Sequence, residues 1–136
     1  LALADFVSVH VPMSGGKALI GSEELACMKK SALIVNTARG GLIDESALHA
    51  ALQSGQIAGA GIDVFLEEPP AANHPLFASE KVILSPHSAS LTAESAIRMA
   101  VMSVKNALDY FDAKLDPAFV VNRDHLSDEA RLHLKA

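Results

Sequence analysis

Three short polar segments, each placed directly after a run of residues typical of a β-strand, constrain the fold of this chain most. Short, continuous apolar runs of this kind are expected of buried strands in a parallel sheet. In open parallel sheets, ligands bind in the crevice beyond the carboxyl ends of the strands. We therefore expect the polar segments to meet at one edge of a sheet. The runs are residues 32–35, 57–64 and 81–84, and the polar segments are residues 36–41, 63–69 and 85–89.

Charged side chains in these segments suit acid–base chemistry on a small carboxylate. Arg39 carries a planar fork of N–H donors that matches the two oxygens of a carboxylate. His87 can exchange a proton near neutral pH, and a glutamate beside it, Glu67 or Glu68, can fix its tautomer and favour its charged form. Taken alone, Arg39 fits a surface loop, and a histidine at a strand end is more often structural than catalytic. Together, the three strand ends predict transfer of a hydride and a proton on a small carboxylate-bearing carbonyl compound.

The composition describes one domain with a hydrophobic core. The chain has 136 residues, 50% of them hydrophobic, and a formal net charge of −5. Without basic clusters, this charge argues against nucleic acid or an anionic membrane surface as a partner. No apolar run approaches the length of a membrane span, and no signal-peptide pattern opens the chain. The single cysteine, Cys27, fits a reducing cytoplasm, and we expect it to be buried in a helix.

Helices are expected between the strands. Residues 5–11 predict a first strand, which Pro12 ends. A short helix over residues 22–30 is expected to begin at an N-cap, Ser22.

The next helix is expected to begin after an N-cap, Asp44, and to stop at Gly55. A third, over about residues 93–111, has an apolar stripe that predicts ordinary packing. Together with the parallel strands, these helices describe an α/β fold. The stripe consists of Ile97, Val101, Val104, Leu108 and Phe111.

No glycine-rich dinucleotide fingerprint occurs in the sequence. Gly59 and Gly61 lack the third glycine of that motif and lie within a predicted strand, so we expect them to permit close packing. The strand, turn and helix N-terminus that would receive a pyrophosphate are missing. The chain also opens on an apolar stretch without Met, and we expect it to have been cut from something longer.

Three sequence blocks, taken in order, carry a resemblance to a known family. They are Asn36-Thr37-Ala38-Arg39-Gly40-Gly41, then Gly61-Ile62-Asp63-Val64-Phe65 followed by Glu68-Pro69, and then Ser85-Pro86-His87. They resemble the signatures of the D-isomer-specific 2-hydroxyacid dehydrogenases, which include phosphoglycerate, glyoxylate/hydroxypyruvate and formate dehydrogenases. The resemblance extends from about Ala4 to Arg123. It implies the second half of a Rossmann-type parallel-sheet nucleotide-binding domain, incomplete and lacking the GxGxxG unit.

The resemblance implies catalytic roles for Arg39, Glu68 and His87. The family's catalytic glutamate immediately precedes a proline, which selects Glu68, whereas Glu67 is expected to be solvated. Arg39 would hold the carboxylate of a 2-oxo acid. His87 would donate a proton to the carbonyl oxygen while the nicotinamide delivers a hydride.

The resemblance also implies which residues would line an NAD or NADP cofactor. Val11 and Pro12 match a segment along its adenosine side, and Asp63 matches the aspartate that bonds the nicotinamide carboxamide. No metal site is implied. The other cofactor-binding candidates lie around the nicotinamide end and are Thr37, Ala38, Arg39, His87, Ser88 and Ala89.

The resemblance divides the chain into three parts and assigns it an activity. Residues 1–92 would form a partial NAD(P)-binding domain, residues 93–123 a crossover helix and return segment to a substrate domain, and residues 124–136 a tail. The complete protein would be a cytoplasmic NAD(P)-dependent 2-hydroxyacid dehydrogenase and a homodimer. Its substrate would be a small 2-oxo or 2-hydroxy acid, with neither nucleic acid nor membrane as a partner.

Two alternatives remain open. The isolated chain is expected to be inactive, and an inactive α/β fragment that only packs or associates would have the same sequence features. The same family also includes transcriptional corepressors that use the fold as a dinucleotide-dependent interaction platform. Nothing basic or disordered in the sequence favours the corepressor alternative.

Overall fold

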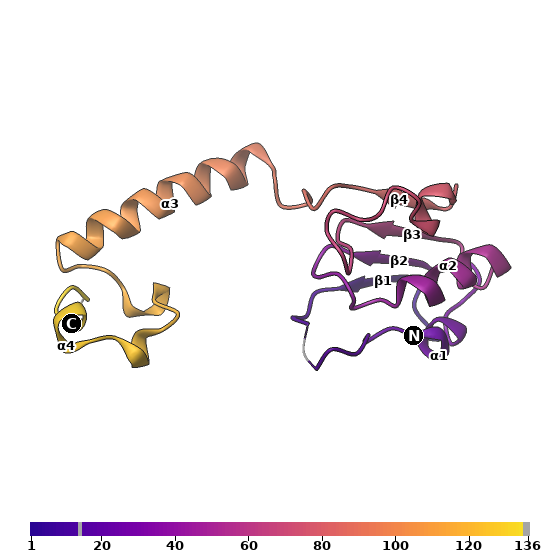
Figure 1. The fold of residues 1–136 in the computed structure, drawn as a ribbon, viewed down its shortest axis with the longest axis horizontal. Coiled ribbons are helices and arrows are strands. Elements are labelled where there is room, and N and C mark those ends of the chain that lie inside the picture. The colour runs from indigo at the N-terminus through magenta and orange to yellow at the C-terminus, as the bar shows by residue number, and fades with distance from the viewer. Residues whose placement is uncertain (14, 135–136) are drawn as a thin grey trace. The chain divides into compact units, whose positions relative to one another are not determined.

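The structure of the chain is a computed structural model, and it describes residues 1–13 and 15–134 (Figure 1). The chain divides into two compact units, unit 1 with residues 1–89 and unit 2 with residues 90–136. The final two residues of the predicted tail, 135 and 136, lie outside the described residues.

Unit 1 is built on a four-stranded parallel sheet, which confirms the predicted fold class. Phe6 lies opposite Leu33, Leu33 opposite Gly59, and Ala60 opposite Val82. The carboxyl ends of neighbouring strands therefore lie side by side, as the arrows in Figure 1 show. The strands, in their order across the sheet, are β1 (Phe6–Val9), β2 (Leu33–Asn36), β3 (Gly59–Ile62) and β4 (Val82–Leu84).

The third strand is shorter than the apolar run that predicted it. Ile57 and Val64 are buried, with 0% and 1% of their surface exposed, although both lie outside β3. The run exceeds the strand because its flanks also pack into the core. Gly59 confirms the expected close packing, since a Cβ there would lie 3.0 Å from the Lys81 carbonyl oxygen and 3.1 Å from the Leu33 side chain.

Helix α2 (Glu45–Ser54) has the predicted start and end. The Asp44 carboxylate accepts a hydrogen bond from the Ala47 N–H at 2.8 Å, and Gly55 ends the helix with a φ of 70°. Leu48 and Leu52 face the core and are almost fully buried. As the crossover between β2 and β3, α2 allows those strands to run parallel.

Helix α1 (Ser22–Ala26) corrects two predictions. Its N-cap is Gly21, whose N–H donates to the Glu24 carboxylate at 2.8 Å, so Ser22 is already helical. Cys27 follows the helix and is exposed rather than buried. The neighbouring Leu25 and Met28 occupy the core side of this segment, at 1% and 4% exposure, and Cys27 faces away from it.

The core of unit 1 lies between the sheet and the segments that cover it. Its buried side chains come from the strands, from α1 and α2, and from the 3₁₀ helix η1 (Pro75–Ala78). Leu76 of η1 is fully buried and so anchors the end of the loop that follows β3.

Unit 2 contains the long helix α3 (Ala93–Phe111), the 3₁₀ helices η2 (Pro117–Phe119) and η3 (Arg123–His125), and α4 (Asp128–Arg131). Thr92 caps α3 by accepting from the Ser95 N–H at 3.1 Å.

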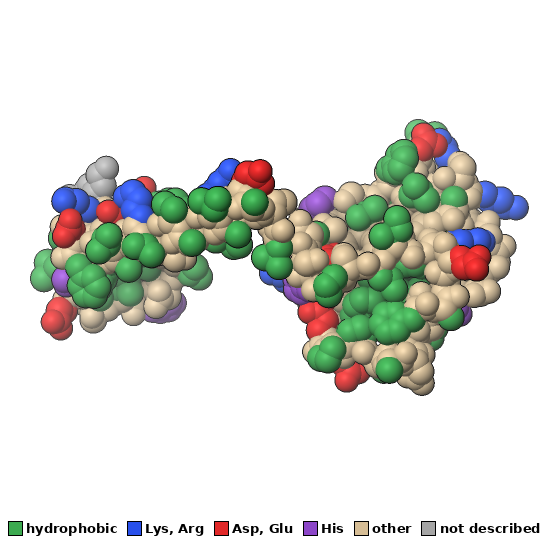
Figure 2. Space-filling view, turned by 90° about the horizontal axis from the view of Figure 1, so that it is seen from above, with side chains coloured by type: hydrophobic (Ala, Val, Ile, Leu, Met, Phe, Trp, Pro, Cys, Tyr) green, Lys and Arg blue, Asp and Glu red, His purple; other side chains and the backbone are tan. Residues whose placement is uncertain are grey.

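The apolar stripe of α3 is exposed, so the prediction of ordinary packing is wrong for this chain. Its members expose between 59% and 76% of their surface, because no other described segment of unit 2 covers them. Hydrophobic side chains are visible along this helix in Figure 2. Within the described residues, no helix has both the length and the apolar character needed to cross a membrane.

Candidate active site

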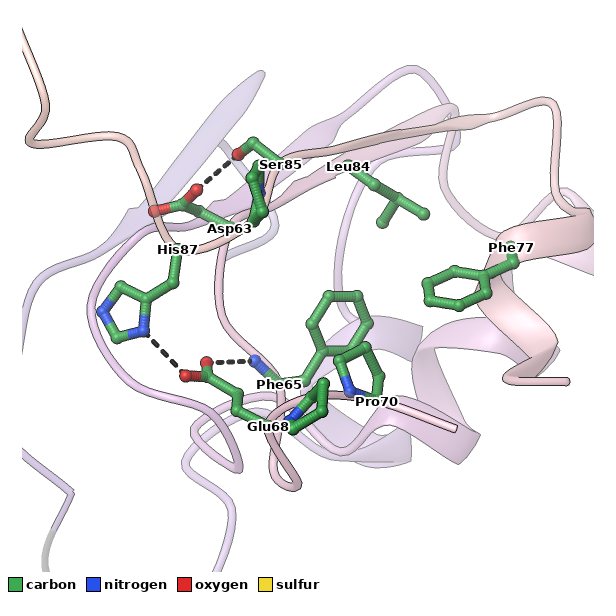
Figure 3. A pocket seen from close by; sticks show the side chains of 10 residues that line it. Asp63, Phe65, Glu68, Pro70, Phe77, Leu84, Ser85 and His87 are labelled. Atoms are coloured by element: carbon green, nitrogen blue, oxygen red, sulfur yellow. Dashed lines mark hydrogen bonds and ion pairs between the residues drawn. The ribbon is translucent and has the colours of Figure 1, made fainter. Parts of the chain in front are cut away.

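Two of the predicted catalytic side chains are in direct contact. The Nδ1 atom of His87 lies 2.8 Å from Oε2 of Glu68 (Figure 3). Glu68 belongs to the loop after β3, and His87 belongs to the segment after β4, so neighbouring strand ends bring them together. Both side chains remain accessible, His87 at 49% and Glu68 at 38% exposure. Glu67 is exposed, as predicted.

Glu68 is oriented by its own loop as well as by His87. Its Oε1 atom accepts a hydrogen bond from the Phe65 N–H at 3.0 Å. The hydrogen bond to His87, followed by the bond from Phe65, lowers the pKa of Glu68 below its ordinary value. Glu68 is therefore an ionised partner for the imidazole at neutral pH.

His87 has an unusual backbone conformation. Its φ is 52°, in the left-handed region that few non-glycine residues adopt. The His87 N–H donates to the backbone oxygen of Asp63 at 2.8 Å, which fixes this turn to the end of β3. The bond through Nδ1 leaves Nε2 as the ring nitrogen available to a reacting molecule.

Asp63 holds the segment on both sides of His87. Its carboxylate, in a residue only 3% exposed, accepts bonds from the Ser85 hydroxyl at 2.5 Å, the Ser88 N–H at 2.8 Å and the Ala89 N–H at 2.9 Å. Desolvation opposes ionisation, but the bonds from Ser85, Ala89 and Ser88 outweigh it and lower the pKa of Asp63. Both carboxylate oxygens thus already have partners within the protein.

Arg39 lies at the end of the neighbouring strand β2 and is exposed. Its Nη1 donates to the Ala38 carbonyl oxygen at 2.6 Å, and no described contact joins it to Glu68 or His87. Buried Asn36 shapes this loop, because its side chain donates to the Arg39 oxygen at 2.9 Å and accepts from the Ala38 N–H at 3.1 Å. This role of Asn36 was not predicted, although an Asn directly after a buried strand is a typical turn signal.

Gly40 brings the loop after β2 against the loop after β3. A Cβ at Gly40 would lie 1.7 Å from the Phe65 carbonyl oxygen, and one at Gly41 would lie 2.9 Å from the Leu66 side chain. The space that a side chain at Gly40 would need is filled by the Phe65 backbone. This close approach sets the distance between the Arg39 and Glu68 loops.

The remaining cofactor-binding candidates also follow the carboxyl ends of strands. Val11 and Pro12 follow β1 and are exposed, whereas Thr37 and Ala38 follow β2 and are half-buried. A pocket of about 380 Å³ adjoins the His87–Glu68 pair (Figure 3). It is lined by Asp63, Phe65, Glu68, Pro69, Pro70, Phe77, Leu84, Ser85, Pro86 and His87.

Residues 1–89, the whole of unit 1, match the family described as "D-isomer specific 2-hydroxyacid dehydrogenase, NAD binding domain". The chain belongs to this family. A glyoxylate reductase of Aeropyrum pernix is 46% identical over 122 residues, which cover 89% of this chain and 36% of that protein. The chain therefore spans about a third of the length of such relatives.

Two solved structures of the family are similar in fold. A D-lactate dehydrogenase from Lactobacillus jensenii with NAD+ is 34% identical, with a TM-score of 0.72, over 78% of this chain and 36% of that one. An NADPH-dependent glyoxylate/hydroxypyruvate reductase from Sinorhizobium meliloti, in complex with NADP and malonate, is 33% identical. Its TM-score is 0.72, over 81% of this chain and 34% of that one.

Metal ligation is not indicated in the part of the chain that the structure describes. There, no group of three or more His, Cys, Asp or Glu side chains is placed to hold an ion. The site thus consists of a histidine–carboxylate pair, an exposed arginine and a buried aspartate at the ends of adjacent strands.

Proposed function

We propose that this chain is the carboxyl-terminal part of an NAD(P)-dependent D-2-hydroxyacid dehydrogenase that interconverts a 2-oxo acid and a 2-hydroxy acid. The observation that carries the proposal is the 2.8 Å contact between His87 and Glu68 at neighbouring strand ends. A histidine paired with an ionised carboxylate is suited to general acid–base catalysis.

In reduction, His87 is the proton donor. Glu68 accepts from Nδ1 and stabilises the charged ring, so Nε2 gives its proton to the substrate's carbonyl oxygen. The exposed guanidinium of Arg39 exchanges its bond to Ala38 for the two oxygens of the substrate carboxylate. When bound, the nicotinamide nucleotide supplies the hydride to the carbonyl carbon. In the reverse direction, neutral His87 accepts the proton of the hydroxyl group.

The residues present fit only part of the cofactor. Val11 and Pro12 would contact its adenosine side, and the strand-end residues would line its nicotinamide end. The glycines of the described segments serve close packing and turns, and no glycine-rich turn opens a helix to receive a pyrophosphate. The nicotinamide-end residues would be Thr37, Ala38, Arg39, Asp63, His87, Ser88 and Ala89.

Asp63 would contribute to that end mainly by holding the backbone of Ser88 and Ala89. Its two oxygens accept three hydrogen bonds within the protein, and only 3% of its surface is exposed. Oδ2 accepts only the bond from Ala89, so it would be the oxygen that retains a lone pair for the carboxamide N–H.

The domain division, the cellular location and the oligomeric state belong to the same proposal. The proposed division at residue 92 is supported by the nearby boundary between the units at residue 89. The division at residue 123 follows from the resemblance alone. A cytoplasmic location is supported by the exposed free thiol of Cys27, since reducing compartments keep such thiols unpaired. We further infer that the complete enzyme is a homodimer that acts on a small 2-oxo acid.

A chimera tests the proposal. This chain would replace the matching carboxyl-terminal segment of the Aeropyrum pernix glyoxylate reductase, to which it is 46% identical. We expect the purified chimera to reduce glyoxylate or another 2-oxo acid with NADH or NADPH, and His87→Ala to abolish the reaction. A folded chimera that binds the dinucleotide but reduces none of a panel of 2-oxo acids would contradict the proposal.

A further inference from the structure

A second histidine–carboxylate pair lies outside the candidate active site. Glu45, in the first turn of α2, lies 3.0 Å through its Oε2 atom from Nε2 of His74, the N-cap of η1. Their side chains are 20% and 16% exposed, so this pair is less accessible than His87 and Glu68. The sequence offers no sign of it, since the two residues are 29 positions apart.

Backbone donors at both ends fix the direction of the bonds in this pair. The Leu66 N–H donates to Oε1 of Glu45 at 2.7 Å, and the Leu76 N–H donates to Nδ1 of His74 at 3.3 Å. Because Nδ1 accepts, the neutral ring carries its proton on Nε2 and donates it to Glu45. An ionised carboxylate at position 45 matches both donors, whereas a Gln amide would place an N–H against one of them.

The Glu45–His74 pair makes contacts at both ends of the loop that carries Glu68. Glu45 holds the amide of Leu66, and Glu68 accepts from the adjacent amide of Phe65. At the other end, the ring of His74 packs edge-on against Phe65, with 5.2 Å between the ring centroids. The backbone at Phe65 and Leu66 is thus held by carboxylates on both sides, one from α2 and one from the loop itself.

We propose that Glu45 and His74 are positioning residues, which fix the loop of residues 65–77 so that the Glu68 carboxylate stays on His87. Neither side chain contacts the reacting atoms; both act through the loop backbone. The importance of this pair for catalysis rests on the function proposed above, whereas its effect on Glu68 does not.

The test is the pKa of Glu68, measured by ¹³C NMR titration of the 136-residue chain with Glu45→Gln and His74→Phe. Phenylalanine keeps a ring against Phe65 but removes both nitrogen atoms. In both variants the pKa of Glu68 should rise toward its ordinary value, because its bonds from His87 and Phe65 lower it in the native loop.

Two matched variants separate positioning from general destabilisation. Glu67→Gln removes an exposed carboxylate from the same loop, and Asp44→Ala removes the cap of the same helix. Both should leave the pKa of Glu68 unchanged. The proposal is overturned if Glu68 titrates as in the native chain in a folded Glu45→Gln or His74→Phe variant, or if Asp44→Ala shifts it as much. Loss of the folded spectrum in both loop variants also overturns it, since the pair would then support the whole fold.

The chimera keeps this inference distinct from the proposed function. There, Glu45→Gln should lower kcat by roughly 10- to 100-fold, because a misplacement of about 1 Å can cost that much. If the chimera shows no turnover but Glu45→Gln still raises the pKa of Glu68, only the proposed function is contradicted. If the chimera is active but the pKa of Glu68 stays unchanged in folded Glu45→Gln and His74→Phe variants, only the positioning role is contradicted.

Discussion

The ionised form of Asp63 is part of the folded structure of unit 1. Three donors converge on its buried carboxylate, and two of them are the backbone amides of Ser88 and Ala89. These bonds connect the end of β3 to both sides of His87. The residue that orients the segment around His87 is thus distinct from the residues proposed to perform the chemistry.

We expect Asp63→Asn to lower the free energy of unfolding by roughly 3 kcal/mol at pH 7, because the Asn amide turns a donor toward a donor and leaves a buried N–H unpaired. The pKa of Asp63 is lowered in the folded state. Its contribution is therefore complete above the unfolded-state value of about 3.9 and is lost as the pH falls through the folded-state pKa. Urea unfolding from pH 7 to pH 3 should show the difference between the two proteins shrinking with acid. A difference that does not change with pH would contradict this assignment.

Glu68→Gln should change the pH dependence of catalysis in the chimera. An ionised carboxylate stabilises a neighbouring imidazolium, so its removal favours the neutral ring of His87. Reduction needs the protonated ring and should begin to fall at lower pH, while oxidation needs the neutral ring and should begin to rise at lower pH. The measurement is kcat/KM against pH in both directions.

Glu67→Gln serves as the control for this experiment, because Glu67 is adjacent and exposed. Its profiles should coincide with those of the unmodified chimera. Profiles that move more for Glu67→Gln than for Glu68→Gln would show that the wrong carboxylate has been assigned.

The sequence predicted which residues sit at the strand ends, but not all of their contacts. Glu68 and His87 were placed together because each follows a strand in a recognisable block. The hydrogen bonds of Asp63 could not be predicted, because they depend on the turn that gives His87 its positive φ. Glu45 and His74 belong to no block, and only the packing of η1 on α2 brings them together.

At the scale of elements, the site depends on how closely two loops approach each other. Gly40 lies so near the Phe65 carbonyl group that any side chain there would displace backbone. The loop after β2 and the loop after β3 therefore pack directly against each other and form one edge. The Arg39 and Glu68 side chains are both presented from this edge.

Gly40→Ala should destabilise unit 1 by about 3 kcal/mol or more, because the added Cβ overlaps backbone that cannot move alone. Gly55→Ala is the matched control, since its φ is 70° and a Cβ there would meet nothing within 4 Å. It should lower the stability by only about 1 kcal/mol, the effect of a left-handed backbone on a non-glycine residue. Urea unfolding of the three proteins measures both values. Equal effects would refute the close approach of the loops.

Elements were predictable where local chemistry decides them. Helix α2 has an Asp cap and a glycine stop, and both lie where the sequence placed them. Helix α1 ends at Ala26 rather than at residue 30, and its N-cap is Gly21 rather than Ser22. The exposure of the apolar stripe of α3 could not be predicted from its spacing, since an amphipathic pattern shows which face is apolar but not what covers it.

At the scale of the whole molecule, the two units differ in how much apolar surface they bury. Unit 1 has a continuous core, whereas no residue of α3 is buried. Tertiary packing provides most of the stability of protein helices. We therefore assign the stability of the chain chiefly to unit 1, which is also the part that matches the NAD-binding domain of the family.

The isolated chain should bind NADH with a Kd of about 1 mM or weaker, which corresponds to about −4 kcal/mol. Its residues fit the nicotinamide end of the cofactor, but its sequence has no glycine-rich fingerprint, and no turn of that kind opens a helix in the described segments to bind a pyrophosphate. It should accordingly show no measurable turnover. Calorimetric titration checks the affinity, and a micromolar Kd would refute the view that the chain holds only part of the site.

The left-handed backbone of His87 has a consequence for how such a sequence changes over time. A φ of 52° costs a histidine about 1 kcal/mol that glycine would not lose. Mutation filtered by stability alone would therefore favour glycine at this position. A gene that had lost its chemistry would be expected to drop the histidine early, while its strands and helices persisted. The residue at position 87 is thus a more sensitive indicator of selection for activity than any residue of the core.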